Sequence, residues 1–374
     1  MIARPLRVQI ALPGLHLVQR GAEVALEAIA AGLARDPAFE VTLLGAGSAR
    51  ADDPYRFVQL PMTPRKRFER FPKFPPLRNE FRWEELTFAW PLWWRSRRER
   101  PDVTMTCSYP FVSWVQRGAR NRAGGRARHV FVTENGDHPA RRLNSEYKLF
   151  RCDGLVCTNP DYYEVNRATW QSALIPNGVD VDTFSPGPGA RGQLGLPDSG
   201  PLVVMVSALI PSKHAALGVR AVAALDGACL AIAGDGPLRD EVDALGRELL
   251  GARYARITLD PARMPSFYRS ADVFLHLSRD EAFGNVYVEA MACGLPVVAH
   301  DYTTSRWILS DQAHLLDTSN PEDTAAALRA ALAEPAGAAG RRHAAMRERF
   351  AWPVVVAAYR EFLLEVLRAG EEES

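Results

Sequence analysis

Two glutamates that lie close together in the sequence are the residues best suited to chemistry in this chain. Glu281 and Glu289 are separated by seven residues in the segment EAFGNVYVE, which also contains Gly284. The preceding run 273–278, VFLHLS, alternates and contains β-forming residues, so it predicts a strand. A helix is expected to begin near Asn285, whose side chain can cap it. Glu281 then precedes the helix, and Glu289 lies about one turn inside it.

The turn between this strand and this helix predicts a site for a phosphorylated ligand, because open α/β sheets bind ligands beyond the carboxyl ends of their strands. The amides of Phe283, Gly284 and Asn285 are expected to point outward there. Amides at a helix N-terminus favour an anion, and Gly284 allows a diphosphate to approach the backbone closely. The alternative is that Glu281 caps the helix and that Glu289 is a solvated helical residue.

The same segment resembles the retaining glycosyltransferases of family 4, which have the GT-B fold. Their hallmark is two glutamates separated by seven residues, followed by small residues and Gly-x-Pro, which is Gly294-Leu295-Pro296 in this chain. In that family the second glutamate binds the ribose hydroxyls of the nucleotide, and the first lies against the transferred sugar. The resemblance therefore implies ribose binding by Glu289 and a catalytic position for Glu281.

Length and composition are those of an ordinary soluble protein with more than one domain. The chain has 374 residues, of which 47% are hydrophobic and 24% charged, and its formal net charge is +1. This balance gives no argument for nucleic acid as a partner. No apolar run reaches the roughly 18 residues of a membrane span, and residues 1–14 resemble a first strand and turn rather than a signal peptide. We expect a cytoplasmic protein, at most peripheral to the inner face of the membrane.

Cysteines and paired aspartates do not predict a metal site. The five cysteines are odd in number and mostly lie in apolar runs, so buried, reduced thiols are expected. Asp180 and Asp182 have the spacing of the Asp-x-Asp metal site of the other large glycosyltransferase fold. They lie in IPNGVDVDTFSP, however, which resembles the hinge segment of family 4. We predict no metal and no cofactor, since the nucleotide sugar is a substrate.

Strand-like and helical patterns alternate along both halves of the chain, which predicts parallel, doubly wound sheets. The fold class is therefore α/β, with two Rossmann-like domains of the GT-B type facing a cleft. We expect an acceptor-binding domain over 1–183, a linker rich in Pro, Gly and Asp over 184–200, and a nucleotide-sugar domain over 201–349. The resemblance implies that the last helix, in 350–374, crosses back to the first domain.

Lys213 is a candidate because lysine is rare in this chain. It follows the strand-like run 201–209 in the sequence IPSKH. An ammonium at such a strand end can neutralise a diphosphate that gains charge as it leaves. The family pattern here is Gly-Arg-Leu-x-x-x-Lys-Gly, but Ala208 replaces the arginine that normally shares the diphosphate. An ordinary surface lysine is the alternative.

Two further glycine-bearing turns follow predicted strands. Gly234 and Gly236 lie in AIAGDGPLRDEV, which by itself is a weak dinucleotide signal because a third glycine is missing. Gly-Asp-Gly-Pro-Leu recurs in family 4 at this place, so the resemblance places Gly234 beside the donor. Gly14 follows the first strand, where a glycine-rich loop of the family reaches the donor phosphates. Only one glycine is present in this loop.

The loop after the strand-like run HVFVTE carries several polar side chains. Relatives often have His-Gly here, with the histidine facing the sugar, and Asn135-Gly136 occupies that register in this chain. Asn135 is therefore assigned to donor binding. Glu134, Asp137 or His138 can contact the sugar or accept the proton of the acceptor, which makes Asp137 and His138 catalytic candidates. A surface histidine is the alternative for His138.

Residues 64–100 mix arginines with aromatic side chains. The favoured interpretation is a loop and helix that pack their aromatics into the first domain on the acceptor side. The other is contact with an anionic bilayer or a lipid-linked acceptor. Acidic residues interrupt the short basic run, which disfavours nucleic acid. The aromatic residues are Phe68, Phe71, Phe74, Phe81, Trp83, Phe88, Trp90, Trp93 and Trp94.

These features predict transfer of a sugar from a nucleotide diphosphate sugar, with UDP slightly favoured, to a hydroxyl of an unidentified acceptor. The resemblance implies retention at the anomeric carbon and a product of polysaccharide, glycolipid or glycoside biosynthesis. Two alternatives stay open. One is a sugar-nucleotide epimerase on a similar fold, and the other is a non-catalytic nucleotide-binding protein, which the missing arginine and histidine suggest.

Overall fold

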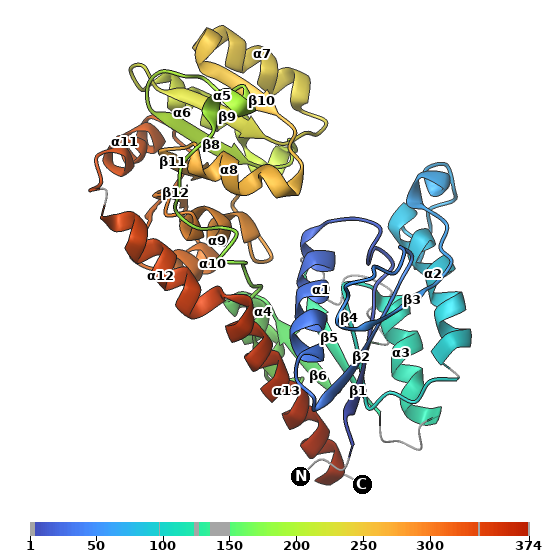
Figure 1. The fold of residues 1–374 in the computed structure, drawn as a ribbon. Helices are drawn as coiled ribbons and strands as arrows, with labels where there is room; N and C mark the ends of the chain where they lie inside the picture. The colour runs from blue at the N-terminus through green and yellow to red at the C-terminus, as the bar shows by residue number, and fades with distance from the viewer. Residues whose placement is uncertain (1–3, 97, 123–126, 135–149, 336, 373–374) are drawn as a thin grey trace. The chain divides into compact units, whose positions relative to one another are not determined.

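The computed structural model describes residues 4–96, 98–122, 127–134, 150–335 and 337–372, and the chain divides into two compact units (Figure 1). The first unit comprises Met1–Asn177 together with Trp352–Ser374, and the second comprises Gly178–Ala351. Each unit contains one parallel sheet with helices on its faces. The predicted α/β class with two Rossmann-like sheets is therefore confirmed.

The first sheet has seven strands in the order β3-β2-β1-β4-β5-β6-β7, and neighbouring strands are parallel. Its central strands are buried because they carry nearly continuous apolar runs, as strands covered on both faces do. The strands are β1 (Leu6–Ala11), β2 (Phe39–Gly45), β3 (Arg56–Gln59), β4 (Val103–Cys107), β5 (Arg128–Thr133), β6 (Gly154–Cys157) and β7 (Ser172–Leu174).

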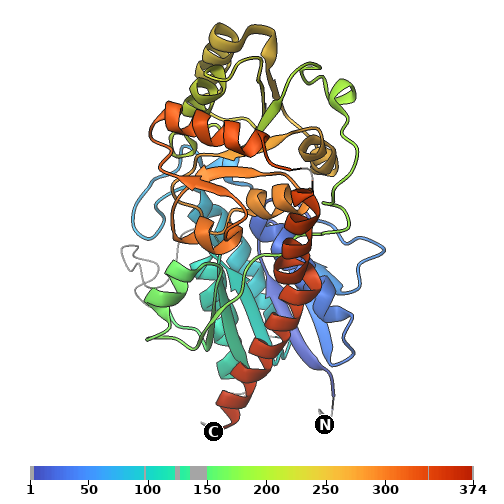
Figure 2. The same ribbon diagram turned by 90° about the vertical axis from the view of Figure 1, so that its left-hand side faces the viewer.

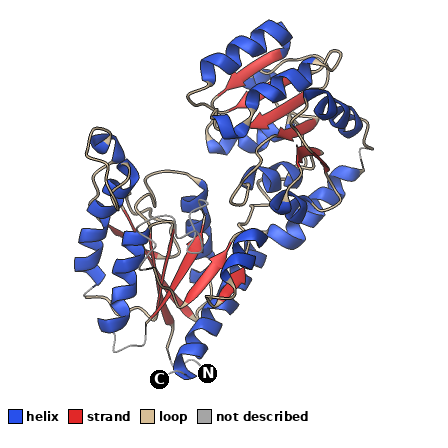
Figure 3. Cartoon of the chain, turned by 180° about the vertical axis from the view of Figure 1, so that it is seen from behind, coloured by secondary structure: helices blue, strands red, loops and turns tan. Residues whose placement is uncertain are grey.

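Helices α1 and α13 pack against each other in the first unit, and so do α2 and α3. Figures 1 and 3 show these two pairs on opposite sides of the sheet. The helices of this unit are α1 (Gly21–Ala34), the 3₁₀ helix η1 (Arg65–Phe68), α2 (Glu80–Ser96), α3 (Pro110–Arg122), α4 (Pro160–Asn166) and α13 (Trp352–Glu372).

The last helix, α13, belongs to the first unit, as the resemblance implied. Its Tyr359, Phe362 and Leu363 are buried in the same core as Ile10 of β1. Gly32 of α1 allows the close approach, because a Cβ there would lie 2.4 Å from a methyl carbon of Val356. Figure 2 shows α13 running alongside the first sheet. An apolar stripe at helical spacing therefore ties the end of the chain to its beginning.

The second sheet has six strands in the order β10-β9-β8-β11-β12-β13, again parallel. Val203 and Val204 of β8 belong to two different apolar clusters, because successive side chains of a strand point to opposite faces. The strands are β8 (Leu202–Val206), β9 (Cys229–Ala233), β10 (Tyr254–Ile257), β11 (Val273–His276), β12 (Val297–His300) and β13 (His314–Leu316).

Helices cover both faces of this sheet. Helices α8, α9 and α12 pack on the face that contains Val204, and α6 and α11 pack on the other face, with α7 against α6. The elements are α5 (Arg191–Leu194), η3 (Pro211–Lys213), α6 (Ala215–Ala223), α7 (Arg239–Leu250), η4 (Gly251–Arg253), η5 (Pro261–Arg263), α8 (Met264–Arg269), α9 (Asn285–Ala292), α10 (Thr303–Leu309), α11 (Pro321–Leu332) and α12 (Ala338–Phe350).

The segment 184–200, expected to be a linker, is a packed part of the second unit. It contains the short helix α5, and Leu194 and Leu196 are buried in the apolar core of that unit. Arg191 also donates to a carboxylate oxygen of Asp272 at 2.7 Å. The chain passes from the first unit to the second at Asn177–Gly178 and returns to the first at Ala351–Trp352. The composition rich in Pro and Gly therefore indicates an irregular segment packed on the second unit rather than a linker between domains.

Candidate functional site

The candidate site lies at the carboxyl edge of the second sheet, where the strand order reverses between β8 and β11. Open α/β sheets bind ligands at such switch points, because the loops that follow the two strands diverge there. The loop after β8 leads to Lys213, and the loop after β11 leads to Glu281. The pairing of the two strands thus brings together residues that are far apart in the sequence.

Glycines of the β9–α7 turn hold the loop that carries Lys213. A Cβ on Gly234 would lie 1.9 Å from the carbonyl oxygen of Ser207, so only glycine fits this backbone approach. The amide of Leu209 donates to the carbonyl of Asp235 at 2.9 Å. Gly234 therefore lies next to the site, in contact with the loop that leads to Lys213.

Lys213 ends the 3₁₀ helix η3, and the next residue, His214, precedes α6 in a left-handed conformation with φ of 52°. This conformation is unusual for a residue with a Cβ and suits glycine, the residue that the family pattern has at this position. Helix α6 begins at Ala215, directly after this residue. The left-handed residue turns the chain from η3 into α6.

Glu281 joins Lys213 and a histidine in one cluster. The ammonium of Lys213 is ion-paired with the carboxylate of Glu281, and the imidazole Nε2 of His276 lies 2.9 Å from the same Oε1 atom. Burial opposes ionisation of this carboxyl, but the interactions with His276 and Lys213 outweigh it and lower the pKa of Glu281 to about 2. Glu281 is therefore negatively charged at neutral pH. Lys213 is half-buried, and this ion pair distinguishes it from an ordinary surface lysine.

Helix α9 begins at Asn285, as the sequence predicted, but Asn285 is not its cap. Gly284 occupies the N-cap position with φ of 89° and provides no side-chain cap. A Cβ on Gly284 would lie 2.7 Å from the ring of Tyr287 and 3.7 Å from Cβ of Glu281. The start of α9 therefore lies beside Glu281. The first turn of any α-helix presents amides without partners within the helix, and these favour an anion.

Glu289 lies one turn further along α9 and is half-buried. Its Oε2 accepts a hydrogen bond of 2.8 Å from the hydroxyl of Tyr268, whereas Oε1 has no hydrogen-bond partner among the described residues. Burial raises the pKa of Glu289 to about 7, although the Tyr268 hydrogen bond acts in the opposite direction. The solvated surface glutamate that was the alternative interpretation does not fit this environment. One oxygen is positioned by Tyr268, and the other is available to a ligand.

The side chain of Phe283 serves the core. It is 2% exposed and packs against Trp307 and Phe350, with ring centroids 6.2 Å and 5.8 Å away. Only the backbone of Phe283 can therefore contribute to the site. The aromatic anchor fixes the turn between β11 and α9 to helices α10 and α12.

Among the described residues, two of the predicted ones, Gly14 and Glu134, belong to the first unit. A Cβ on Gly14 would lie 2.0 Å from Oε1 of Glu23, so this loop packs against a buried carboxyl. Glu134 accepts a hydrogen bond of 3.0 Å from Asn177, and burial raises its pKa to about 7. Asn135, Asp137 and His138 lie outside the described residues, and their assignments stay predictions.

Sequence reasoning missed His276 and Tyr268. His276 is 3% exposed at the end of β11, and its ring contacts that of Tyr287 edge-on at 5.0 Å. An imidazole in an otherwise apolar strand, five residues before Glu281, was the available signal. Tyr268 ends the apolar face of a short helix and gave no comparable signal, because only the packing of α8 against α9 brings its hydroxyl to Glu289.

Clusters of metal-ligating side chains are absent from the described residues. Across the described ranges, no group of three His, Cys, Asp or Glu side chains could hold a metal ion. Asp180 instead stabilises a turn, since its carboxylate accepts hydrogen bonds from the amide and hydroxyl of Thr183 at 3.1 Å and 2.7 Å. All five cysteines are free, and every one except Cys152 is buried.

The fold and the cluster define a two-sheet α/β protein with a candidate anion site at a switch point. Comparison with known proteins adds the family. Residues 19–183 match the sequence model described as Glycosyltransferase Family 4, and residues 189–351 match that described as Glycosyl transferases group 1. The chain therefore belongs to glycosyltransferase family 4, as its resemblance implied.

Individual relatives match this chain only in part or at low sequence identity. The chain is 31% identical, over 63% of its length, to a D-inositol 3-phosphate glycosyltransferase of Geodermatophilus obscurus, and it spans 59% of that protein. It is 36% identical, over 33% of its length, to a GDP-mannose-dependent phosphatidylinositol monomannoside mannosyltransferase of Mycolicibacterium smegmatis, of which it spans 37%. HepE of Anabaena, solved with UDP-glucose, is similar in fold, with a TM-score of 0.73, 18% identity and coverage of 97% of this chain and 100% of HepE.

Proposed function

We propose that this protein transfers a sugar from a nucleotide diphosphate sugar to a hydroxyl of an acceptor, with retention at the anomeric carbon. One observation carries the proposal: Lys213, Glu281 and the N-terminus of α9 lie together at the switch point, and Glu289 follows one turn along the same helix. A cation and helix amides suit a diphosphate, and a carboxylate oxygen beyond them suits the ribose hydroxyls.

Each residue then has a distinct part. Lys213 and the amides at the start of α9 stabilise the charge that develops on the departing diphosphate. Glu281 keeps the ammonium of Lys213 in position and stays ionised beside the sugar. Oε1 of Glu289 accepts from the ribose, while Tyr268 holds Oε2. Ala208 supplies no positive charge, so Lys213 carries more of this stabilisation than it would with an arginine beside it.

Retention is proposed through attack on the same face of the sugar, with the leaving phosphate accepting the proton of the acceptor. Glu289 is committed to the ribose in this scheme and does not serve as a nucleophile. No described carboxylate is assigned to a covalent intermediate, and no metal or cofactor is proposed. Catalysis then rests on positioning and electrostatic stabilisation.

For the donor we propose a UDP-sugar, with a GDP-sugar as the alternative that the mannosyltransferase relative raises. For the acceptor we propose a polyhydroxylated molecule, by analogy with the relative named for D-inositol 3-phosphate. Both assignments are independent of the roles given to Lys213 and Glu289, because those residues address the diphosphate and ribose that all such donors share.

A donor screen tests the proposal. UDP-, GDP- and ADP-sugars are added singly, and the melting temperature is followed to find the nucleotide that stabilises the protein. The selected donor is then incubated with candidate acceptors, and the anomeric configuration of the product is read by NMR. Turnover without an acceptor points to an epimerase, and stabilisation without any turnover points to a non-catalytic binding protein. Either result contradicts the proposal.

We also propose peripheral contact with an anionic membrane through residues 64–100. The structure supports both sequence interpretations in part, since Phe68 and Phe88 are buried while Trp90 and Trp94 are 65% and 53% exposed. Exposed indoles on one helix next to arginines suit the interface of a bilayer. Within the described residues, no helix is both long and apolar enough to span a membrane.

A further inference from the structure

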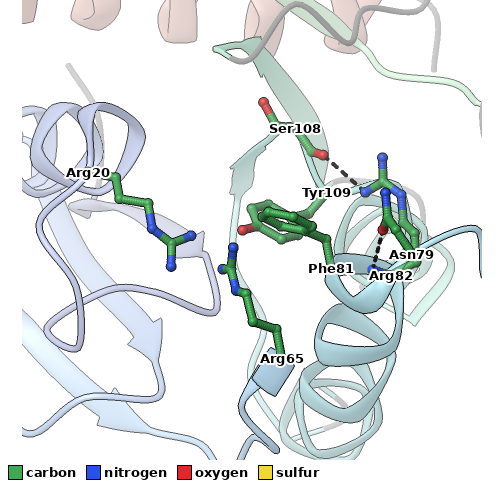
Figure 4. A pocket seen from close by; sticks show the side chains of 7 residues that line it. All are labelled: Arg20, Arg65, Asn79, Phe81, Arg82, Ser108 and Tyr109. Atoms are coloured by element: carbon green, nitrogen blue, oxygen red, sulfur yellow. Dashed lines mark hydrogen bonds between the residues drawn. The ribbon is translucent and has the colours of Figure 1, made fainter. Parts of the chain in front are cut away.

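The first unit contains a pocket that none of the predicted site residues lines. It has a volume of about 490 Å³ and lies between the start of α1, the η1–α2 segment and the turn after β4. This volume is within the usual range for small-molecule sites. Figure 4 shows three arginines and a tyrosine around it: Arg20, Arg65, Arg82 and Tyr109.

Arg65 is held in a fixed orientation at the wall of the pocket. Its Nε and Nη2 atoms donate to the two carboxylate oxygens of Glu84 at 3.2 Å and 2.6 Å. Its guanidinium carbon lies 4.0 Å from the ring centroid of Phe81, which also lines the pocket. A guanidinium fixed by a carboxylate on one edge and a ring on one face can offer Nη1 to a ligand with little loss of entropy.

Arg20 faces Arg65 across the pocket, as Figure 4 shows. It precedes α1, and its side chain forms no hydrogen bond or ion pair with any residue that the structure describes. The hydroxyl of Tyr109 likewise has no hydrogen-bond partner within the described ranges, and in Figure 4 it points toward the guanidinium of Arg65. Three donors without a complete set of partners are thus turned toward one space.

The floor of the pocket is rigid. Arg82, which is 5% exposed, donates to Glu85 at 2.9 Å and to the carbonyl of Ser108 at 3.4 Å. Glu85 in turn accepts from the amides of Phe111 and Val112 at the start of α3, at 2.6 Å and 3.1 Å. This network fixes the turn that presents Tyr109.

Charges around the pocket leave a positive excess on the side of Arg20. Glu84 compensates Arg65, and Glu85 compensates Arg82. Glu23 is a further acid on which the charge of Arg20 acts. It is 2% exposed, and burial raises the pKa of its carboxyl despite that opposing charge. The charge of Arg20 is therefore only partly balanced by the protein, and an anionic ligand can balance the remainder.

We propose that this pocket binds the anionic group, a phosphate ester or a carboxylate, of a small polyhydroxylated acceptor. Arg20, Nη1 of Arg65 and the Tyr109 hydroxyl contact the anion, and the exposed ring of Phe81 packs against the carbon skeleton. The inference rests on the proposed function, because it names the acceptor class of that reaction. Free phosphate and the diphosphate of the donor carry similar anionic groups and could bind the same side chains. The experiment distinguishes them from a phosphorylated or carboxylated acceptor.

Binding is measured by calorimetry with D-inositol 3-phosphate against inositol and with glucose 6-phosphate against glucose, and with orthophosphate alone. The variants are Arg20→Gln and Arg65→Lys. The second variant keeps the positive charge but loses the planar guanidinium with its paired N–H donors. Arg35→Gln is the matched control, since Arg35 is exposed at the other end of α1. At least one phosphate ester is expected to bind about tenfold or more tightly than its neutral parent. Both pocket variants lose this preference, and the control keeps it.

Equal binding of ester and parent, or a preference that survives Arg20→Gln, overturns the inference. Binding of orthophosphate without any ester overturns it as well, because the acceptor skeleton then contributes nothing. A preference lost in Glu289→Gln but kept in Arg20→Gln places the anion in the donor site and also rejects the inference. Nucleotide binding is titrated separately with Glu289→Gln. Failure of the proposed function appears in that titration, and failure of the pocket appears in the Arg20 variant.

Discussion

The ammonium of Lys213 is ion-paired with the carboxylate of Glu281, although the two residues are 68 positions apart. Both are mostly shielded from solvent, with side chains 18% and 17% exposed. The ion pair places Lys213, the proposed contact to the diphosphate, beside Glu281, the proposed contact to the sugar, beyond the carboxyl ends of β8 and β11. The carboxylate of Glu281 also holds the ammonium of Lys213 in the site, so that the position of the ammonium is set before a substrate binds.

Replacing Lys213 with Met keeps the length of the side chain and removes its charge. We expect kcat to fall by about two to three orders of magnitude, because loss of one preorganised electrostatic contact to a transition state has an effect of that size. Steady-state kinetics with the donor found by the screen measure it. Lys66→Met, at an exposed lysine of the first unit, is the control. A wild-type kcat in Lys213→Met removes this lysine from the mechanism.

The low pKa of Glu281 makes a stability prediction. Its pKa is about 2 in the folded protein against an ordinary value of 4.5, so the folded state favours the ionised form. The resulting stabilisation is present above pH 4.5 and is lost as the pH falls toward 2. The free energy of unfolding is measured in urea for wild type and Glu281→Gln across this range. Their difference should shrink as the pH falls, and a constant difference contradicts the assignment.

Replacing Glu289 with Gln should weaken nucleotide binding about tenfold or more, because a charged acceptor for two ribose hydroxyls is lost. Calorimetry with the nucleoside diphosphate measures the affinity. Glu322→Gln, at an exposed position in the first turn of α11, is the control. Unchanged affinity in Glu289→Gln rejects its role in ribose binding.

The same residue predicts a pH dependence. Burial raises the pKa of Glu289 to about 7, so the carboxylate that accepts from ribose is populated above that pH and is protonated below it. Nucleotide affinity should therefore rise between about pH 6 and pH 8. Titrations at several pH values measure the rise in wild type. In Glu289→Gln the rise should be absent, and a step that persists there belongs to another group.

Gly284→Ala tests the turn before α9. The added Cβ would lie 2.7 Å from the ring of Tyr287, and φ of 89° is unfavourable for alanine. We expect a loss of about 1–3 kcal/mol in the free energy of unfolding. Gly340→Ala in α12 is the matched control, because its Cβ would meet nothing within 4 Å. That change should stabilise the protein by about 0.5–1 kcal/mol. Equal effects of both changes would show that the turn tolerates a side chain.

The membrane proposal depends on two exposed indoles. The double change Trp90→Ala and Trp94→Ala should reduce binding to vesicles that contain anionic lipid by about tenfold or more, since indoles contribute strongly at the bilayer interface. Co-sedimentation measures the bound fraction. Val165→Ala changes another apolar side chain of the first unit, 55% exposed, and should leave binding unchanged. Vesicle binding that survives loss of both indoles contradicts the proposal.

Local sequence patterns determined the architecture. Alternating apolar runs such as VFLHLS and the helical stripes between them express backbone preferences and burial that act over a few residues. They were enough to predict two parallel sheets, the start of α9 at Asn285 and the position of Lys213 just beyond β8. The spacing of Glu281 and Glu289 is also local, so the resemblance that identified the family needed no structure.

Tertiary structure alone decided which side chains meet. Lys213 reaches Glu281 only because β8 pairs with β11, and Tyr268 reaches Glu289 only because α8 packs on α9. The composition of 184–200 suggested a linker, but burial of Leu194 in the second core made it part of that unit. The pocket around Arg20 likewise joins three separate segments of the first unit. Such contacts depend on long-range packing, which no short window of sequence encodes.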